Sequence, residues 1–358
     1  MNEFAVVGAG PAGTRFARRV ADRGADVVVF EQGRVGEPLA CSGHVSVDLW
    51  PYVPDSARER LTQNEIAGAR FHTRGPGSDA YRLHKDRPVS NVIDRVGLDR
   101  TLAEAARETG ADVREGHTVL DVTERPDHVA LTVRGPDGVE THRARMVAGC
   151  DGPTSRVRDA VGLPEPEEFV HGVLGFDDEP DDGDLVDVHL TPPTFFAWRI
   201  PRGAAGAEYG LAAPPGESVD RFEAFLEGYG VETDRRFSGL IPIGPPETVS
   251  ARRTVLIGDA AGQTKPFTGG GIRYGLRAAD HAAEALDPRD PSTTAAYERA
   301  WREDLATEIR LGKLLRTCYS LPEPLQRLGL SAFEGEIGVH MDRPSTLLSR
   351  EQLRALVS

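Results

Sequence analysis

A G-x-G-x-x-G motif near the N-terminus has the spacing with which proteins bind the phosphates of a dinucleotide. Gly8 permits a tight turn, Gly10 lets the backbone approach a pyrophosphate, and Gly13 lets the following helix pack on the strand. Ala12 lies at the start of that helix, where free N–H groups attract anions. Glu31 follows at the spacing expected of a carboxylate that accepts ribose hydroxyls. The motif predicts a dinucleotide site without distinguishing NAD from FAD.

A second nucleotide pattern lies in the C-terminal half. Asp259 follows an apolar strand predicted at residues 254–257, and the glycines at 269–271 then open a helix. A carboxylate can hold sugar-side hydroxyls, and bare N–H groups at a helix N-terminus can face an anionic or polar ring edge. A third turn, Asp151-Gly152, follows another apolar strand, although such a turn in isolation is usually only a turn. A dinucleotide that is held at both halves needs this layout.

Two further segments carry groups that could do chemistry. Cys41 and His44 lie in a loop after the Glu31 strand, where a thiol or an imidazole could supply a proton. Phe196 and Trp198 alternate along a predicted strand. Such alternation more often indicates ordinary core, and an isolated cysteine is more often inert than reactive.

These residues need a scaffold that brings distant segments together. The chain begins with the strand–helix–strand pattern of a βαβ unit, and a strand-rich block at 165–245 separates the N-terminal nucleotide motifs from Asp259. Residues 40–90 read as irregular. The predicted helices cover 11–23, 94–108, 218–228, 270–286 and 293–319; the predicted strands cover 4–7, 26–30, 129–133, 139–145, 146–150, 169–176, 185–190, 195–200, 207–212 and 237–243.

Composition excludes several classes of protein. A formal net charge of −14 argues against a nucleic-acid partner and against electrostatic docking on anionic lipid. Three Lys against 39 Arg, with excess acid, suit a high-salt cytosol, although GC-rich codon usage explains the scarce lysine equally well. The three scattered cysteines predict no metal site, and together with the absence of a recognisable leader they indicate a reducing cytoplasm. No apolar run is long enough for a transmembrane helix.

The three nucleotide elements as a set resemble the FAD-binding fingerprint of the glutathione-reductase-2 structural group, which includes aromatic hydroxylases. Val92-Ile93-Asp94-Arg95 resembles the Asp-Arg motif of the same group. The resemblance implies FAD as the cofactor. Gly75-Pro76-Gly77 follows no strand and opens no helix, so a second dinucleotide domain is not expected.

The segments 39–46 and 196–201 are similar to those of the geranylgeranyl reductase family, flavoenzymes that saturate prenyl chains. The family has a Cys-Gly-x-Gly-type segment beside the flavin and an aromatic-x-Trp-x-Phe-Pro motif that lines a lipid cavity. This chain departs from it at Ser42, His44, Phe196 and Ile200, and Lys265 stands where the family often has an acid. Flavin contacts are implied for Cys41, Ser42, His44, Arg95, Val119, Asp259, Gly270, Gly271 and Ile272, and substrate contacts for Phe196, Trp198 and Ile200.

The expected fold is α/β: a Rossmann-type FAD-binding domain, an inserted antiparallel-sheet substrate domain and a helical C-terminal part. The FAD-binding domain is expected at 1–45, 85–160 and 250–290, the substrate domain at 46–84 and 161–249, and the helical region at 291–358.

The implied activity is FAD-dependent saturation of prenyl C=C bonds in a lipid or isoprenoid, with Cys41, His44 and Trp198 as the candidate catalytic residues. The candidate proton donors are His44, Cys41, Tyr274 and a water. An external donor, NAD(P)H or a ferredoxin or flavoprotein, would reduce the flavin. The protein is expected to be cytoplasmic with peripheral contact to a membrane. The competing hypothesis is an NAD(P)H-dependent aromatic-ring monooxygenase on the same scaffold. An electron-transfer flavoprotein that feeds a quinone is a second alternative, weakened because three scattered cysteines cannot ligate an iron–sulfur cluster.

Overall fold

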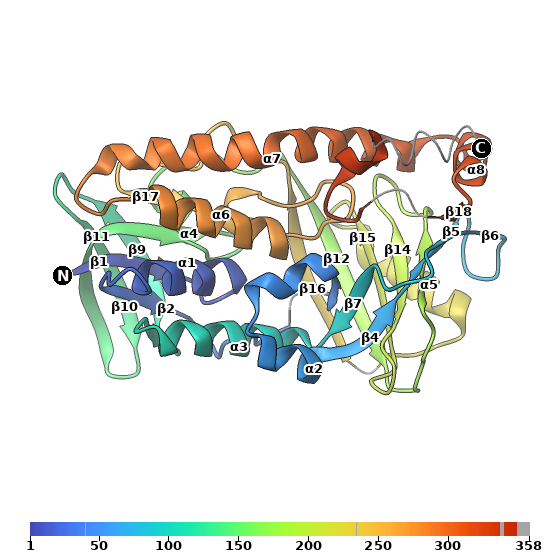
Figure 1. The fold of residues 1–358 in the computed structure, drawn as a ribbon, viewed down its shortest axis with the longest axis horizontal. Coiled ribbons are helices and arrows are strands. Elements are labelled where there is room, and N and C mark those ends of the chain that lie inside the picture. The colour runs from blue at the N-terminus through green and yellow to red at the C-terminus, as the bar shows by residue number, and fades with distance from the viewer. Residues whose placement is uncertain (40, 234, 337–339, 349–358) are drawn as a thin grey trace.

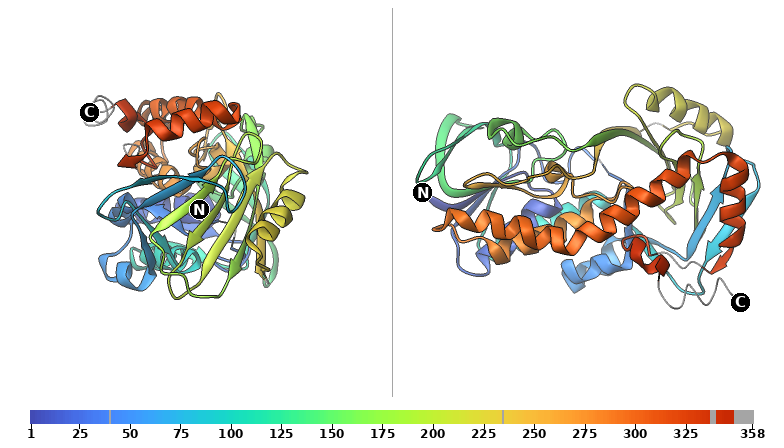
Figure 2. Two further views of the ribbon diagram at one scale, coloured as in Figure 1. Left: turned by 90° about the vertical axis from the view of Figure 1, so that its right-hand side faces the viewer. Right: turned by 90° about the horizontal axis from the view of Figure 1, so that it is seen from above.

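The computed structural model describes residues 1–39, 41–233, 235–336 and 340–348. Its strands form three sheets, of seven, eight and three strands. The seven-stranded sheet lies toward one end of the long axis and the eight-stranded sheet toward the other (Figure 1). Helix α7 (Thr294–Thr317) runs along much of the molecule, as Figure 2 shows from above. The mixed α/β architecture with C-terminal helices that the sequence predicts is confirmed.

The seven-stranded sheet has the order β8-β2-β1-β11-β10-β9, and β17 pairs with β11. Its members β1, β2, β8, β11 and β17 pair in parallel, whereas β9, β10 and β11 form an antiparallel meander. The strands are β1 (Asn2–Val7), β2 (Val27–Phe30), β8 (Asp112–Arg114), β9 (Thr118–Glu124), β10 (Val129–Gly135), β11 (Gly138–Gly149) and β17 (Thr254–Leu256). The two strands predicted at 139–145 and 146–150 are one continuous strand, β11. No turn residue interrupts that run.

Three helices pack beside this sheet. Helix α1 (Pro11–Ala21) lies between α3 (Arg95–Glu108) and α6 (Ile272–Ala285), and it contacts both (Figure 1). The register pairs Val7 with Phe30 and with Gly149, and Gly149 with Leu256. The parallel strands β1, β2, β11 and β17 therefore end at one edge, where ligands bind in sheets of this kind. The turns after β1, β11 and β17 meet there, as the sequence motifs require.

The eight-stranded sheet has the order β16-β12-β15-β14-β13-β5-β6-β18. Helix α5 (Ser218–Tyr229) packs on one face through Phe222 and Phe225, against Tyr209 and Leu211. The alternate residues of the same strands, including Trp198 on β14, form a separate cluster on the other face. The strands are β5 (Gly68–His72), β6 (Ala80–His84), β12 (Glu168–Asp177), β13 (Leu185–His189), β14 (Ala197–Pro201), β15 (Ala207–Ala213), β16 (Arg235–Ile243) and β18 (Gly335–Glu336).

The reading of residues 40–90 as irregular is wrong. This stretch supplies β5 and β6 to the eight-stranded sheet. It also supplies β3 (His44–Ser46) and β4 (Thr62–Ile66), two of the three strands of the sheet β3-β7-β4. The remaining strand, β7 (Ser90–Ile93), leads into Asp94, whose side chain caps α3 by accepting from the Gly97 N–H. Strand β5 pairs in parallel with the distant β13, a contact that local sequence pattern does not reveal.

The remaining helices are the two C-terminal helices, α7 and α8, and two short ones. Helix α7 buries Tyr297, Trp301, Leu305 and Ile309, a spacing of four residues that places one face against α6. Helix α8 (Glu323–Ala332) follows at one end of the molecule, near β6 (Figure 1). The short helices α2 (Arg58–Leu61) and α4 (Arg156–Ala160) complete the set.

Candidate active site

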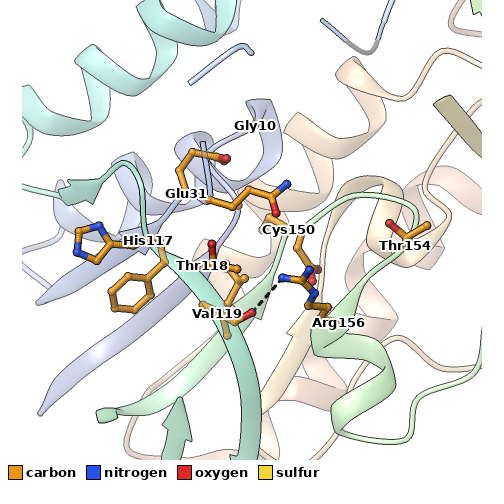
Figure 3. A pocket seen from close by; sticks show the side chains of 13 residues that line it. Gly10, Glu31, His117, Thr118, Val119, Cys150, Thr154 and Arg156 are labelled. Carbon is orange, nitrogen blue, oxygen red and sulfur yellow. Dashed lines mark hydrogen bonds between the residues drawn. The ribbon is translucent and has the colours of Figure 1, made fainter. Parts of the chain in front are cut away.

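Two cavities open at the edge where the parallel strands end. The smaller, of about 190 Å³, is lined by the ends of β1, β2 and β9 and by the turn after β11 (Figure 3). The larger, of about 1120 Å³, extends to the inner face of the eight-stranded sheet. Gly10 and Cys150 line both cavities, which therefore meet at the N-terminus of α1.

The turn after β1 has room for a pyrophosphate. Gly8 has φ +96°, and an added Cβ would lie 2.4 Å from the Cys150 carbonyl oxygen. A Cβ at Gly13 would lie 2.1 Å from the Gly8 carbonyl oxygen, so α1 approaches the strand as closely as only glycine allows. A Cβ at Gly10, in contrast, would meet no described atom within 4 Å and would fill empty space. No described side chain caps α1, so the N–H groups at Ala12 and Gly13 face that space.

Glu31 is held where the sequence predicts. Its Oε2 accepts from the Ala9 N–H at 2.9 Å and its Oε1 from the Gly33 N–H at 3.0 Å. Each carboxylate oxygen keeps a lone pair that can accept a ribose hydroxyl. Val119 lines the same small cavity, and its carbonyl oxygen accepts from Arg156 Nη1 at 3.4 Å, the dashed line in Figure 3. Glu31 and Val119 therefore share one cavity, at the opposite end of the site from Asp259.

Asp259 and the three glycines border the larger cavity. Burial raises the pKa of Asp259 to about 6, against a lowering by the Arg95 guanidinium. A Cβ at Gly271 would lie 2.4 Å from Asp259 Oδ1, so glycine is needed for the start of α6 to pass this carboxylate. Gly271 is the N-cap of α6 and, like Gly10, receives no side-chain cap from the described residues. Gly270 and Ile272 line the cavity beside it.

Two uncapped helix N-termini, α1 and α6, thus face one cavity system that also holds Glu31 and Asp259. The empty space in front of Gly10 is the volume that a pyrophosphate needs, and the two carboxylates lie at its two ends. This donor and acceptor set fits FAD, which carries hydroxyls on both sides of its pyrophosphate.

Cys41 and Arg95 both line the larger cavity, and each affects the pKa of the other. Burial raises the pKa of the Cys41 thiol, and the Arg95 guanidinium lowers it by a smaller amount. Arg95 Nη1 lies 2.5 Å from Asp99 Oδ1, and its Nε meets no hydrogen-bond acceptor in the described part of the chain. Cys41 is therefore a thiol at neutral pH and not a thiolate nucleophile, and its Sγ donates to the Ser42 carbonyl oxygen at 3.3 Å.

His44 lies on the same cavity wall but is uncharged at neutral pH. Burial, followed by the nearby Lys265 ammonium, lowers its pKa to about 4. Its Nε2 shares a hydrogen bond of 2.7 Å with Ser90 Oγ. Ser42 lines the cavity between Cys41 and His44, so the structure brings this predicted group of three together.

The predicted substrate residues form an apolar wall. Phe196, Trp198 and Ile200 all line the larger cavity. The rings of Phe196 and Trp198 meet edge to face, with centroids 5.7 Å apart. Apolar side chains from neighbouring strands continue the wall: Leu174, Val186, Val188, Leu240 and Ile241.

Sequence reasoning missed the C-terminal part of this wall. Leu321, Leu325 and Phe333 line the cavity from α8 and its flanks, and the leucine spacing of this segment is the signal that could have identified them. The sequence pattern does not explain why a lysine stands at position 265. In the structure, Lys265 Nζ donates to Oδ1 of the buried Asp342 at 2.7 Å.

The larger cavity combines these walls. Its lining gathers every predicted site residue except Gly8, Gly13, Glu31, Val119 and Tyr274. Gly8, Glu31 and Val119 line the smaller cavity, and Gly13 packs behind it.

Known proteins resemble this chain over most of its length. Residues 2–182 match the family described as FAD binding domain. The chain is 28% identical over 350 residues to digeranylgeranylglycerophospholipid reductase 2 of Methanothermobacter thermautotrophicus, covering 91% of this chain and 88% of that protein. It is 29% identical over 338 residues to the protein of the same name from Methanopyrus kandleri, covering 86% of this chain and 84% of that protein. Both matches agree with the family resemblance seen in the sequence.

Solved structures share the fold. A geranylgeranyl bacteriochlorophyll reductase-like protein from Thermoplasma acidophilum superposes with a TM-score of 0.86 at 22% identity, over 100% of this chain and 96% of that one. The p-nitrophenol 4-monooxygenase of Pseudomonas putida superposes with a TM-score of 0.72 at 19% identity, over 99% of this chain and 98% of that one. Reductases and monooxygenases thus share this scaffold, so the choice between them depends on the site.

Proposed function

The chain belongs to the FAD binding domain family, and we propose that it is an FAD-dependent reductase that saturates prenyl C=C bonds of a lipid or isoprenoid. The observation that carries this proposal is the cavity of about 1120 Å³, which joins an FAD-type site to a wall of apolar and aromatic side chains. The names of the curated relatives, matched over most of their length, support the same substrate class.

Bound FAD, once reduced, supplies the hydride. The residues proposed to hold it divide by position: the turn at Gly8–Gly13 for the pyrophosphate, Glu31 and Val119 for the adenosine half, and Asp259 with the start of α6 for the flavin half. Residues 1–45, 85–160 and 250–290 form the proposed FAD-binding part, and 46–84 with 161–249 the substrate part.

The chain's own residues supply the proton and the environment. Cys41 is the proposed proton donor, because its thiol stays protonated at neutral pH while His44 stays uncharged. Protonating an unactivated alkene develops positive charge on carbon. The faces of Phe196 and Trp198 stabilise such charge and exclude water from it. NAD(P)H, or a ferredoxin or flavoprotein, is proposed as the external electron donor.

The test is anaerobic. The FAD-loaded protein is reduced chemically and mixed with geranylgeranyl lipids, and products are weighed by mass spectrometry. Mass gains of two hydrogens per double bond are expected. Absence of saturation with every prenyl substrate, despite bound reduced FAD, would refute the proposal. Rapid NADPH oxidation with peroxide release, stimulated by an aromatic substrate, would favour the monooxygenase instead.

Membrane contact belongs to the same proposal. No helix among the described residues is long and apolar enough to cross a bilayer. Four of the eight exposed large apolar side chains in the described residues fall between residues 314 and 328, from the end of α7 into α8: Leu314, Leu321, Leu325 and Leu328. Leu321 and Leu325 also line the cavity, so the exposed apolar surface continues into it. We propose that this leucine surface rests on a lipid surface, from which a prenyl chain enters the cavity.

Removing the leucine surface is expected to release the protein from vesicles. Burying a leucine contributes about 1.5 kcal/mol, so Leu325→Ser with Leu328→Ser should weaken partitioning onto phosphatidylcholine vesicles about 100-fold. Flotation measures it, and Val139→Ser with Val219→Ser, at exposed positions elsewhere, is the matched control. Anionic vesicles should bind no better than neutral ones, because the net charge is −14. Equal flotation of both double variants would contradict the assignment.

A further inference from the structure

Glu208 is a buried carboxylate that the function described above does not use. It lies on β15, is 0% exposed, and sits behind Trp198 without itself lining the cavity. A carboxylate removed from water is costly unless it gains partners. Its partners therefore indicate what it does.

The Glu208 carboxylate binds the aromatic wall of the candidate active site. Its Oε1 accepts from Trp198 Nε1 at 2.8 Å. Burial raises the pKa of Glu208, whereas Trp198, Arg202, Ser42 and Gly43 lower it. Arg202 Nη1 lies 3.8 Å from Oε2, which meets no hydrogen-bond donor within the described ranges. The hydrogen bond from Trp198 therefore ties this carboxylate to the β14 aromatic wall.

Trp198 depends on this contact for its orientation. The register places Trp198 opposite Gly210, where an added Cβ would lie 2.1 Å from the indole Cε2. The ring therefore lies flat on the Gly210 backbone, and packing fixes its plane. An indole has a single N–H, and Glu208 accepts it, so the hydrogen bond fixes the direction in which the ring edge points.

We propose that Glu208 is a positioning residue, which holds the Trp198 indole in one fixed orientation on the wall of the cavity. The inference rests on the proposed function in one respect, since Trp198 matters for turnover only if prenyl reduction is the reaction. The contact itself is independent of the substrate.

The matched pair Glu208→Gln and Glu208→Ala tests the proposal. Glutamine keeps the shape and an amide oxygen for the Trp198 N–H, whereas alanine removes the acceptor. In FAD-loaded protein carrying [15N]tryptophan, the indole signal that Trp198→Phe removes should shift clearly in Glu208→Ala and little in Glu208→Gln. With a geranylgeranyl lipid, kcat should fall at least about tenfold in Glu208→Ala and less than about threefold in Glu208→Gln, since a small misplacement is enough to slow an oriented reaction. KM should change less than kcat.

The outcomes separate the possible errors. An unmoved indole signal in Glu208→Ala would overturn the proposal, whatever happens to turnover. Equal loss of kcat in both variants would also overturn it, because the charge or the proton of Glu208 would then matter and not its shape. If wild-type protein reduces no prenyl lipid, the proposed function fails, and the indole signals still decide whether Glu208 holds the ring. The melting temperature and flavin absorbance of both variants show that each is folded and loaded.

Discussion

Gly10→Ala is expected to leave the fold intact while weakening FAD binding about 100-fold, which is about 2.8 kcal/mol at 1.4 kcal/mol per tenfold. The added Cβ would meet no described protein atom within 4 Å, and the backbone at Gly10, with φ −69° and ψ −179°, suits alanine. The methyl group would enter the space in which the backbone approaches the pyrophosphate. Isothermal titration of apoprotein with FAD measures the loss, and thermal unfolding of the apoprotein should be unchanged.

Two matched glycines show that the effect belongs to the site. Gly75→Ala adds a methyl group that also meets no described atom within 4 Å, but at a surface turn, so FAD affinity should stay at the wild-type value. Gly13→Ala should lower both stability and FAD affinity, because its Cβ would lie 2.1 Å from the Gly8 carbonyl oxygen and push α1 off the strand. Wild-type FAD affinity in Gly10→Ala would show that the pyrophosphate does not bind at this turn.

The nucleotide half of the site could be predicted because its determinants are local. The turn after β1 needs φ +96° at Gly8, and the start of α6 admits only glycine at Gly271. Both requirements can be recognised in the sequence from a few neighbouring residues. Glu31 follows the same logic, because its strand ends at the sheet edge to which Gly8 belongs. The βαβ register therefore brings together residues that the sequence lists separately.

The substrate half could be predicted only in part, because its walls come from long-range pairing. Strand β5 pairs in parallel with β13, which lies more than 100 residues later in the chain. The residues of β5 show no strong alternation of buried and exposed side chains. Glu208 stands in a strand that the sequence predicts, yet its partner Trp198 becomes visible only when strands β14 and β15 pair. Asp342 likewise pairs with Lys265, which lies 77 residues earlier in the chain.

Trp198→Ala should keep FAD and lose most prenyl reduction. Trp198 lies on β14 of the eight-stranded sheet, away from the helix starts that face the pyrophosphate, so the flavin absorbance should be retained. A desolvated cation–π contact is worth about 2 kcal/mol, which predicts a fall in kcat of about 30-fold when the ring is removed. Trp198→Phe retains an aromatic face and loses only the N–H to Glu208, so its kcat should lie between those of wild type and Trp198→Ala.

The control for Trp198→Ala must be equally disruptive but outside the cavity. Phe222→Ala removes a fully buried ring of α5, which packs on the opposite face of the same sheet, and should cost about 3–5 kcal/mol of stability. At a temperature where both variants are folded, Phe222→Ala should reduce prenyl lipid at nearly the wild-type rate. Unchanged kcat in Trp198→Ala would remove the aromatic wall from the mechanism. Equal losses in the two variants would assign the effect to the stability of the sheet, because only Trp198 faces the space in which charge develops on the alkene.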